Sequence, residues 1–188
     1  HDPGQNLFRD DVVSGEPPAY ESYPVIPLTR NFRNTRRIAE VVKSLCRGAA
    51  DPHPGAPVGF EPEIAQQKSG RELKKQLDSL VQKLVSQEQV KPEAIALLTP
   101  HTRENSCLAE IGEIGGVKIS DKFQDREGAL LHSSISGFKG LESDVVILLD
   151  IDPEDVRCSV NARYVGASRA RSYLYVFTLG DWMQGAPA

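Results

Sequence analysis

Apolar residues along the chain fall into two patterns that alternate from one end to the other. Apolar residues at helical spacing predict helices over residues 35–46, 71–87, 103–114 and 159–170. Short apolar runs predict strands over residues 25–28, 58–60, 94–98, 117–119, 130–135, 145–149 and 173–178. The run Val145–Leu149 is the strongest of these strands, because a strand that is covered on both faces has no polar side. Helices that alternate with buried strands predict an α/β fold with a mainly parallel sheet.

Breaks in the pattern divide the chain into a leading segment, one domain and a tail. Residues 1–23 hold three prolines and no periodic apolar pattern, so they are predicted to form a linker. The predicted helices and strands all fall within residues 24–180, and residues 181–188 are expected to be a frayed tail. A chain of 188 residues is long enough for one core of ordinary size.

Composition excludes several classes of protein. A hydrophobic content of 39% is too high for a wholly disordered chain. The apolar runs are far shorter than the ~20 residues that a membrane-spanning helix needs. The net charge of −4 argues against general coating of nucleic acid, but not against binding along a local groove. Basic residues are concentrated between positions 28 and 47, where six of them accompany a single acid, Glu40.

Cysteine and histidine positions show no metal-ligand spacing. The cysteines are Cys46, Cys107 and Cys158. Each has apolar neighbours, so buried, unpaired thiols in a reducing cytoplasm are expected. The polar N-terminus contains no apolar signal segment, which agrees with a cytoplasmic location. The sequence therefore predicts no metal site.

Three short polar segments could carry chemistry, although each also has a plain structural explanation. Leu28–Thr35 places Arg30 and Arg33 between a predicted strand and a predicted helix, where a solvated basic helix start would suffice. Ser133–Glu142 is a loop with two glycines, whose N–H groups could bind an anion or form an ordinary tight turn. Asn161–Arg171 is a predicted helix that ends in two arginines, which the helix dipole alone would favour.

Taken in order, these segments read NFR, FKGLE and YVGASRAR, and they resemble motifs IV, V and VI of the UvrD/Rep-type superfamily 1 DNA helicases. The family forms are close to N-Y-R-S, T-I-H-x-x-K-G-L-E-F and Y-V-A-x-T-R-A. The opening DPGQNLF resembles the end of motif III, usually G-D-x-x-Q-x-I-Y. The resemblance implies a RecA-like three-layer domain, the second motor domain (2A) of such a helicase. Residues 1–23 would then include the end of motif III from the first motor domain.

The resemblance also implies that ATP and Mg²⁺ lie between two motor domains and are bound mainly by the first. The phosphate-binding G-x-x-x-x-G-K-[ST] segment of that first domain does not occur in the 188 residues, so the isolated chain is expected to have no ATPase activity. Arg33 and Arg169 would be arginine fingers that reach the γ-phosphate. Gln5 would sense the γ-phosphate or orient the attacking water.

The motif V segment would supply further nucleotide contacts. The residues implied are Lys139, Gly140 and Glu142. The carboxylate of Glu142 would accept a hydrogen bond from the ribose, and the backbone at Gly140 would lie near the phosphates. Lys139 would add a positive charge beside them.

The resemblance implies two partners, single-stranded DNA and the first motor domain of the same chain. No membrane partner is expected. Phe8 would stack against a base, and Ser134 would contact a DNA phosphate. Ser136 stands at the motif V position that is usually histidine. His101 follows the predicted strand 94–98, at the edge expected to face DNA.

Departures from the family pattern leave a second interpretation open. Serine replaces histidine at position 136 and phenylalanine at position 143. The residues between Arg33 and Ser134 already contain predicted core elements, so an inserted 2B domain is not expected. This puts processive unwinding in doubt more than ATP hydrolysis. The alternative is a non-catalytic RecA-like module that binds a protein partner or nucleic acid, and the retained charged motif residues count against it.

Overall fold

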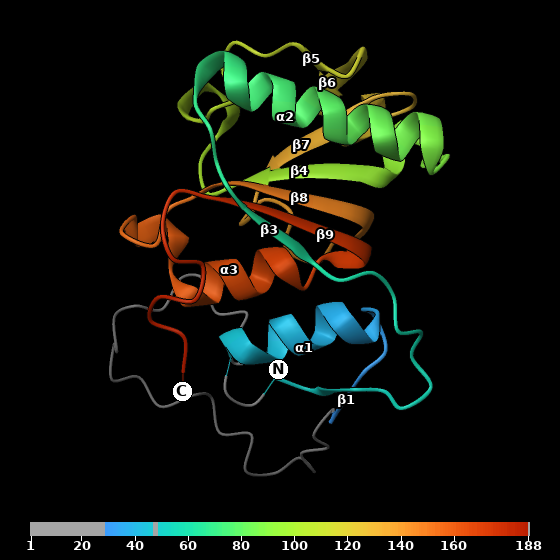
Figure 1. The fold of residues 1–188 in the computed structure, drawn as a ribbon, viewed down its shortest axis with the longest axis vertical. Helices are drawn as coiled ribbons and strands as arrows, with labels where there is room; N and C mark the ends of the chain where they lie inside the picture. The colour runs from blue at the N-terminus through green and yellow to red at the C-terminus, as the bar shows by residue number, and fades with distance from the viewer. Residues whose placement is uncertain (1–28, 47–48, 188) are drawn as a thin grey trace.

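A seven-stranded sheet lies at the centre of the described residues (Figure 1). The computed structural model describes residues 29–46 and 49–187. The strand predicted over residues 25–28 lies outside these residues, as do Gln5 and Phe8. Within the described part of the chain the fold is a mixed α/β fold of the RecA-like type, which confirms the predicted fold class.

The order of strands in this sheet is β3-β9-β8-β4-β7-β6-β5. The strands are β3 (Glu63–Gln66), β4 (Ile95–Thr99), β5 (Glu113–Ile114), β6 (Val117–Ser120), β7 (Leu130–Ser134), β8 (Ser143–Ile151) and β9 (Ala170–Thr178). Every neighbouring pair is parallel except β5 and β6. A separate parallel pair is formed by β1 (Arg30–Asn31) and β2 (Asp51–Pro52). The mainly parallel sheet that the sequence predicts is therefore confirmed.

Helices cover both faces of the sheet and complete three layers (Figure 1). Helix α2 (Gly70–Gln82) lies on one face, and helices α1 (Arg36–Leu45) and α3 (Val160–Ala167) lie on the other. In β8, alternate residues enter different cores. Val145, Ile147 and Leu149 pack in the cluster that includes α2. Val146 and Leu148 pack in the cluster that includes α1 and α3. This division explains why the strand is apolar on both sides.

Short helical turns complete the structure. They are a π-helical turn, η3 (Lys83–Gln87), and the 3₁₀ turns η4 (Pro92–Ala94), η5 (Arg103–Asn105), η6 (Phe123–Asp125) and η7 (Val156–Cys158). The helix predicted over residues 71–87 is thus α2 followed directly by the π-helical turn. The described residues contain no helix of the length and apolar character needed to cross a membrane.

The helix predicted over residues 103–114 is wrong. Only the turn η5 forms there, and β5 follows at Glu113. The side chain of Arg103 donates to the carbonyls of Leu108 and Ile111, at 3.4 and 2.6 Å. The N–H of Cys107 donates to a carboxylate oxygen of Asp150, at 2.8 Å. Arg103, within the segment, and Asp150, in β8, therefore take backbone groups that a helix would have used.

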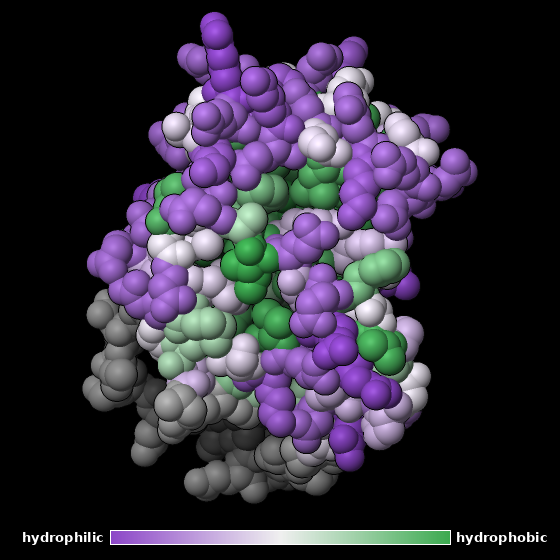
Figure 2. Space-filling view, viewed as in Figure 1, coloured by the Kyte–Doolittle hydropathy of each residue, from purple (hydrophilic) through white to green (hydrophobic). Residues whose placement is uncertain are grey.

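The short strand predicted over residues 58–60 is also wrong. The segment belongs to no strand, and its carbonyls serve a helix and not a sheet. The carbonyls of Pro57 and Val58 accept from the N–H groups of Arg36 and Arg37, at 2.9 and 3.1 Å. These N–H groups belong to the first turn of α1, where no helix carbonyl is available to them. The apolar side chains of this stretch reach the surface beside β3 (Figure 2), and the Phe60 ring stacks on Tyr173.

The tail after Gly180 packs on the domain and does not fray as predicted. Trp182 is only 4% exposed and belongs to the core under α1 and α3. The guanidinium of the buried Arg163, in α3, donates to the carbonyls of Trp182 and Gln184. These contacts attach the tail to α3.

Cys158 is buried as predicted, whereas Cys46 and Cys107 are only partly buried. Burial raises the pKa of Cys158 to about 12 and moves the pKa of Cys107 well above its ordinary value. Cys107 and Cys158 are best explained as packing residues, since a thiol with a raised pKa is a poor nucleophile at neutral pH.

Gly59 allows the segment 57–60 to pack against the N-terminus of α1. Its φ is +73°, and a Cβ at this position would lie 2.3 Å from Cβ of Thr35. Gly116 has a similar φ of +80°, but a Cβ there would meet no atom within 4 Å. The two glycines therefore share the same backbone requirement and differ in the space around them.

We expect Gly59→Ala to lower the free energy of unfolding more than Gly116→Ala does. Both changes force alanine into the left-handed region, which costs about 1–2 kcal/mol. Only Gly59→Ala also displaces Thr35, and such overpacking adds about 1–3 kcal/mol. Urea denaturation of both variants measures the difference. Equal losses in the two variants would show that the segment 57–60 moves away at no cost.

Candidate functional site

The predicted site residues collect at opposite ends of the central strands. Thr99, at the carboxyl end of β4, pairs with Ser134, whereas Ile95, at its amino end, pairs with Val145. His101, Ser134 and Ser136 therefore lie at the carboxyl ends of β4 and β7. Glu142 and Arg169 directly precede β8 and β9 and lie at the amino ends. The loop 135–142 connects the two ends.

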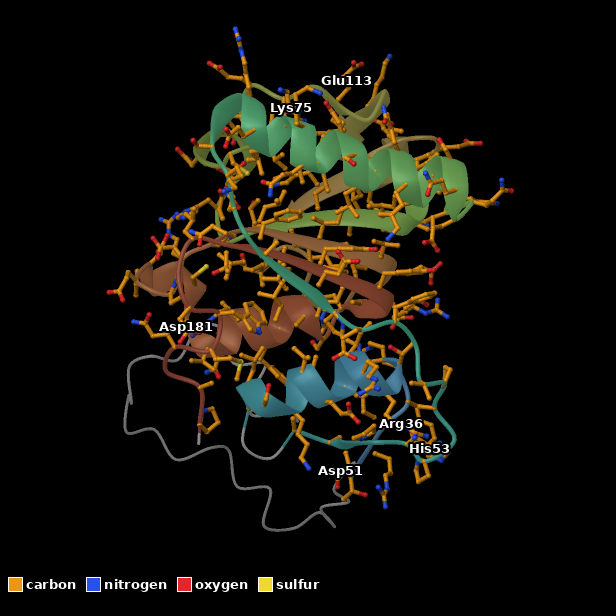
Figure 3. The ribbon with its side chains drawn as sticks, viewed as in Figure 1. Arg36, Asp51, His53, Lys75, Glu113 and Asp181 are labelled. Atoms are coloured by element: carbon orange, nitrogen blue, oxygen red, sulfur yellow. The ribbon has the colours of Figure 1, made fainter. Side chains whose placement is uncertain are left out.

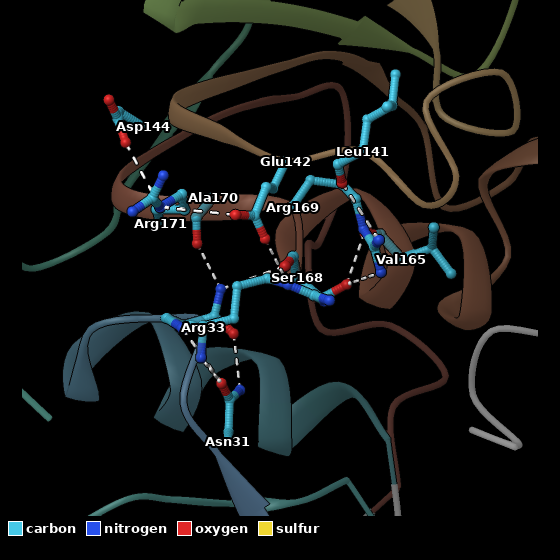
Figure 4. Close-up of polar contacts among 11 residues, drawn as sticks. Asn31, Arg33, Leu141, Glu142, Asp144, Val165, Ser168, Arg169, Ala170 and Arg171 are labelled. Carbon is cyan, nitrogen blue, oxygen red and sulfur yellow. Dashed lines mark hydrogen bonds and ion pairs between the residues drawn. The ribbon is translucent and has the colours of Figure 1, made fainter.

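The charged end of the sheet is formed by five residues, which we name the arginine edge (Figure 4). They are Arg33, Glu142, Asp144, Arg169 and Arg171. Arg33 comes from the turn between β1 and α1. Glu142 directly precedes β8 and Asp144 lies in it, whereas Arg169 directly precedes β9 and Arg171 lies in it. The three segments that resemble motifs IV, V and VI, which keep those numbers as labels, thus meet at one place, although Arg33 and Arg171 are 138 positions apart in the sequence.

Asparagine side chains shape the turn that carries Arg33. The Asn31 Oδ1 atom accepts from the N–H groups of Arg33 and Asn34, at 2.9 and 3.2 Å. Thr35 is the N-cap residue of α1, and Asn34 directly precedes it. The Asn34 side chain is only 3% exposed and donates through Nδ2 to the carbonyls of Ser168 and Ala170. Asn34 therefore attaches the motif IV turn to the backbone around Arg169.

Glu142 lies between two arginines. Its Oε2 atom is 3.0 Å from Nε of Arg33, and its Oε1 atom is 3.8 Å from Nε of Arg171. Arg171 also lies 3.6 Å from a carboxylate oxygen of Asp144. All four side chains are about half exposed, so the ions are screened and contribute little to stability. Their arrangement is more informative about ligand binding than about folding.

Arg169 is turned into the protein and is 1% exposed. Its guanidinium donates to the carbonyl of Val165 at 3.1 Å, to Oγ of Ser168 at 2.9 Å and to the carbonyl of Leu141 at 3.4 Å. The first of these carbonyls lies in the last turn of α3, where helix carbonyls need outside donors. In this conformation Arg169 closes the end of α3 and joins it to the motif V loop.

Lys139 and Gly140 lie on the exposed part of the motif V loop. Gly140 has a φ of +88° and open space around the position of a Cβ. Phe138, beside them, is buried and holds the loop against the core. One exposed segment, residues 139–142, therefore carries all three predicted nucleotide contacts, which are Lys139, Gly140 and Glu142.

The other end of the sheet carries a groove of about 370 Å³, which we name the serine groove. Its lining residues are Pro100, His101, Thr102, Ser134, Ile135, Ser136, Val156, Arg157, Ser159 and Ala162. The structure thus brings together the three predicted DNA contacts within the described residues, namely His101, Ser134 and Ser136. The Oγ atoms of Ser134 and Ser136 are 3.2 Å apart, and the Ser134 hydroxyl also accepts from the N–H of Gly137.

His101 is held between an acid and an arginine on the wall of the serine groove. Nδ1 lies 3.0 Å from a guanidinium nitrogen of Arg157, which can only donate, so Nδ1 accepts. The proton is therefore on Nε2, which donates to Oδ2 of Asp155 at 2.7 Å. The pKa of Asp155 is held below its ordinary value, chiefly by the N–H of Arg157 and further by His101. The ring is thus fixed in one orientation.

A polar chain that runs through the buried Thr99 and His132 adjoins the same groove at His101. Thr99 donates to the carbonyl of His101 at 2.7 Å, and its Oγ1 is 3.0 Å from Nε2 of His132. Nδ1 of His132 is 2.7 Å from Asp121, which also accepts from Arg103. Burial lowers the pKa of His132, although Asp121 opposes this shift. His132 therefore joins β7, β4 and the groove without facing solvent.

Sequence reasoning missed three residues at these sites. Arg171 was explained by the helix dipole, but it lies in β9, because α3 ends three residues earlier than residue 170. Arg157 lies in a turn that apolar periodicity does not detect. Phe32 is 73% exposed and stacks on His53 beside Arg33, at the corner where Figure 3 shows His53 and Arg36. An exposed aromatic next to a motif arginine was the available signal for it.

The described residues contain no group of three His, Cys, Asp or Glu side chains that could hold a metal ion. The positive charges of the arginine edge suit phosphate oxygens and not a cation, because guanidinium is a donor only.

We expect Asn34→Ala to lower the free energy of unfolding by about 1–3 kcal/mol, because two buried carbonyls lose their donor. Asn105→Ala is the matched control, since it removes an exposed amide that donates only to Thr102. That change should cost less than about 0.5 kcal/mol. Chemical denaturation measures both values. Equal effects would show that the Asn34 contacts to Ser168 and Ala170 do not stabilise the fold.

The lowered pKa of His132 makes stability depend on pH. The unfolded chain binds a proton near the ordinary histidine pKa of about 6.5, whereas the folded chain resists it. The unfolded state therefore binds more protons in this range, and stability falls as pH drops from about 7 to 5. We expect His132→Gln to show a smaller fall in urea denaturation across this window, and the two proteins to run parallel above about pH 7.5. An unchanged fall in the variant would contradict the assignment.

Comparison with protein-family models gives no match, and comparison with curated proteins gives none either. Among solved structures, the chain is similar to the C-terminal domain of a possible DNA helicase from Lactobacillus plantarum. The TM-score is 0.59 at 18% identity, over 84% of this chain and 94% of that one.

Two viral helicases show a weaker likeness. Arterivirus nonstructural protein 10 gives a TM-score of 0.42 at 14% identity, and methylated PRRSV nsp10 gives 0.41 at 16%. They align with 86% and 85% of this chain, but with only 27% and 26% of their own lengths. At such identities the similarity concerns the fold alone. The chain therefore has the fold of the C-terminal domain of the possible helicase, which is a mixed α/β fold of the RecA-like type.

Proposed function

We propose that this chain is the C-terminal motor domain of an ATP-dependent superfamily 1 DNA helicase or translocase of the UvrD/Rep type. The observation that carries the proposal is the convergence of motifs IV, V and VI at the arginine edge. A single loop, 135–142, connects this edge to the serine groove. The fold shared with the helicase C-terminal domain supports the same conclusion.

The arginine edge suits the phosphates of ATP. Arg33 is half exposed and always charged, so it can stabilise negative charge that develops on the transferred phosphoryl group. Lys139 and the backbone at Gly140 would contact phosphates. The Glu142 carboxylate would accept a hydrogen bond from a ribose hydroxyl. Arg169 would reach the γ-phosphate only after it leaves the carbonyls of Val165 and Leu141. Gln5 keeps its proposed place at the γ-phosphate.

The phosphate-binding loop and Mg²⁺ ligands that ATP hydrolysis requires would come from a first motor domain. The sequence contains no G-x-x-x-x-G-K-[ST], and the described residues offer no carboxylate cluster for Mg²⁺. Bound Mg²⁺ neutralises the phosphate charge in such reactions. The role of this chain is to supply cations from the opposite side of the nucleotide.

The serine groove suits a single nucleic-acid strand. The hydroxyls of Ser134 and Ser136 can donate to phosphodiester oxygens, and Arg157 adds a positive charge. His101 is fixed at the wall of the groove with its ring orientation set. Phe8 would stack against a base of the DNA strand. The exposed ring of Phe32, beside Arg33, would stack against the base of ATP at the arginine edge.

Coupling between the two ends would run through the motif V loop. Ser134 begins this segment in the serine groove, and Glu142 ends it at the arginine edge. Phe138 is buried midway and links the loop to the core. Closure of two motor domains around ATP could therefore shift the strand-binding hydroxyls by moving one short loop.

A non-catalytic module that binds a protein partner or nucleic acid is the second candidate. One observation favours it: the buried contacts of Arg169 give that residue a structural reason to be present without ATP. The exposed Arg33 has no comparable buried role. Substitution of Arg33 therefore separates the two candidates.

We expect the full-length chain that contains these 188 residues to hydrolyse ATP faster when single-stranded DNA is added. Arg33→Ala should lower the turnover rate by about 10³-fold, as loss of an arginine finger does in other systems. Arg126→Ala is the control, because Arg126 lies over the Phe123 ring and belongs to neither the arginine edge nor the serine groove. A phosphate-release assay measures the rates. Absence of turnover in the unmodified chain would favour the non-catalytic module.

A further inference from the structure

The function proposed above assigns no role to Arg171. Its position beside Glu142 at the arginine edge suggests a role in binding phosphate. We infer that Arg171 and Arg33 form a two-arginine clamp for the triphosphate of a nucleotide, in which Glu142 is the internal counter-ion that phosphate oxygens replace. The inference rests on the proposed function, because it assigns a further binding residue to the same site.

The two arginines reach the same carboxylate from different parts of the chain. Arg33 contacts Oε2 of Glu142, and Arg171 contacts Oε1 (Figure 4). Two guanidinium groups this close repel each other unless an anion lies between them. Glu142 supplies that anion in the structure. Its two oxygens occupy the position that two oxygens of a phosphate would take, since guanidinium matches both groups in the same planar geometry.

The clamp is accessible, whereas the predicted second finger is not. The side chains of Arg33 and Arg171 are 40% and 54% exposed, against 1% for Arg169 as a residue. A phosphate that arrives from solvent meets Arg33 and Arg171 first. Arg169 would need to break three hydrogen bonds to the protein before it could contribute.

The backbone fixes the spacing of the clamp. The N–H of Thr35 donates to the carbonyl of Arg171 at 3.1 Å. The buried Asn34 amide donates to the carbonyl of Ala170, one residue earlier. Arg33 and Arg171 are therefore each within two residues of a direct link between the motif IV turn and β9. Such links place the two cations before the ligand binds, so less ordering is needed on binding.

Glu142 also explains why the isolated chain should bind phosphates weakly. The two arginines are balanced by two acids, Glu142 and Asp144, so the unliganded clamp has no net charge. An incoming triphosphate must compete with Glu142 for both guanidinium groups. Once phosphate displaces it from the arginines, the Glu142 carboxylate can accept a hydrogen bond from a hydroxyl group. This agrees with its proposed contact to the ribose.

Titration of the ¹⁵N-labelled 188-residue chain with inorganic tripolyphosphate at low salt tests the clamp. We expect weak, saturable shifts in the backbone amides near residues 33, 142 and 171. Glu142→Gln should bind about fivefold more tightly, because it keeps the shape of the side chain and removes the competing charge. Arg171→Ala and Arg33→Ala should each bind about fivefold more weakly. Arg171→Lys should fall between Arg171→Ala and the unmodified chain.

Matched controls separate the clamp from a general effect of charge. Arg126→Ala removes one positive charge elsewhere and should leave the affinity for tripolyphosphate unchanged. An oligothymidylate titration distinguishes nucleotide phosphates from a nucleic-acid backbone, and Arg171→Ala should not weaken it. Amide spectra without ligand confirm that each variant is folded.

Three results would overturn the inference: no saturable binding of tripolyphosphate, Arg171→Ala binding as tightly as the unmodified chain, or Arg171→Ala weakening only oligothymidylate binding. The ATPase assay of the full-length chain is independent of these results. If DNA-stimulated turnover depends on Arg33 while Arg171→Ala leaves tripolyphosphate binding intact, the motor function stands and the clamp is wrong. If the binding pattern holds without turnover, the clamp stands as a phosphate site and the motor function is wrong.

Discussion

The buried amide of Asn34 is the contact on which the arginine edge depends. It donates to the carbonyls of Ser168 and Ala170, which flank Arg169 in the connection between α3 and β9. These carbonyls lie where a helix has ended and need donors from elsewhere in the chain. Because Asn34 is only 3% exposed, water cannot replace it. The turn that carries Arg33 is consequently fixed against the segment that carries Arg169 and Arg171.

Burial separates the two motif VI arginines, although they are only two positions apart. Arg169 lies inward and serves carbonyls, whereas Arg171 lies in the exposed start of β9. Side chains two positions apart on a regular strand would face the same side. Arg169 precedes the strand, so it is not bound by that alternation. The end of α3 therefore decides which arginine meets solvent.

The two ends of the sheet have different physical characters. Apart from the buried Arg169, the arginine edge is an exposed network of paired charges, held by backbone contacts behind it. The serine groove is lined by polar and apolar side chains, and the buried Thr99 and His132 connect its wall at His101 to the exposed Asp121. A hydroxyl-bearing groove at one end and a preset pair of cations at the other are both suited to binding phosphate groups. The short loop 135–142 is the direct covalent connection between them.

The sequence by itself determined the α/β class, the central strand β8, the helices α1, α2 and α3, and the three motifs. It did so because apolar periodicity and local motif chemistry are properties of neighbouring residues. Tertiary structure decided the rest. It tied the loop at residues 103–114 to Asp150, which accepts from the N–H of Cys107, and it attached Trp182 to Arg163. It also placed Arg171 beside Glu142 and Arg169 inside. Contacts between residues far apart in the sequence govern burial and charge pairing, and a linear pattern contains neither.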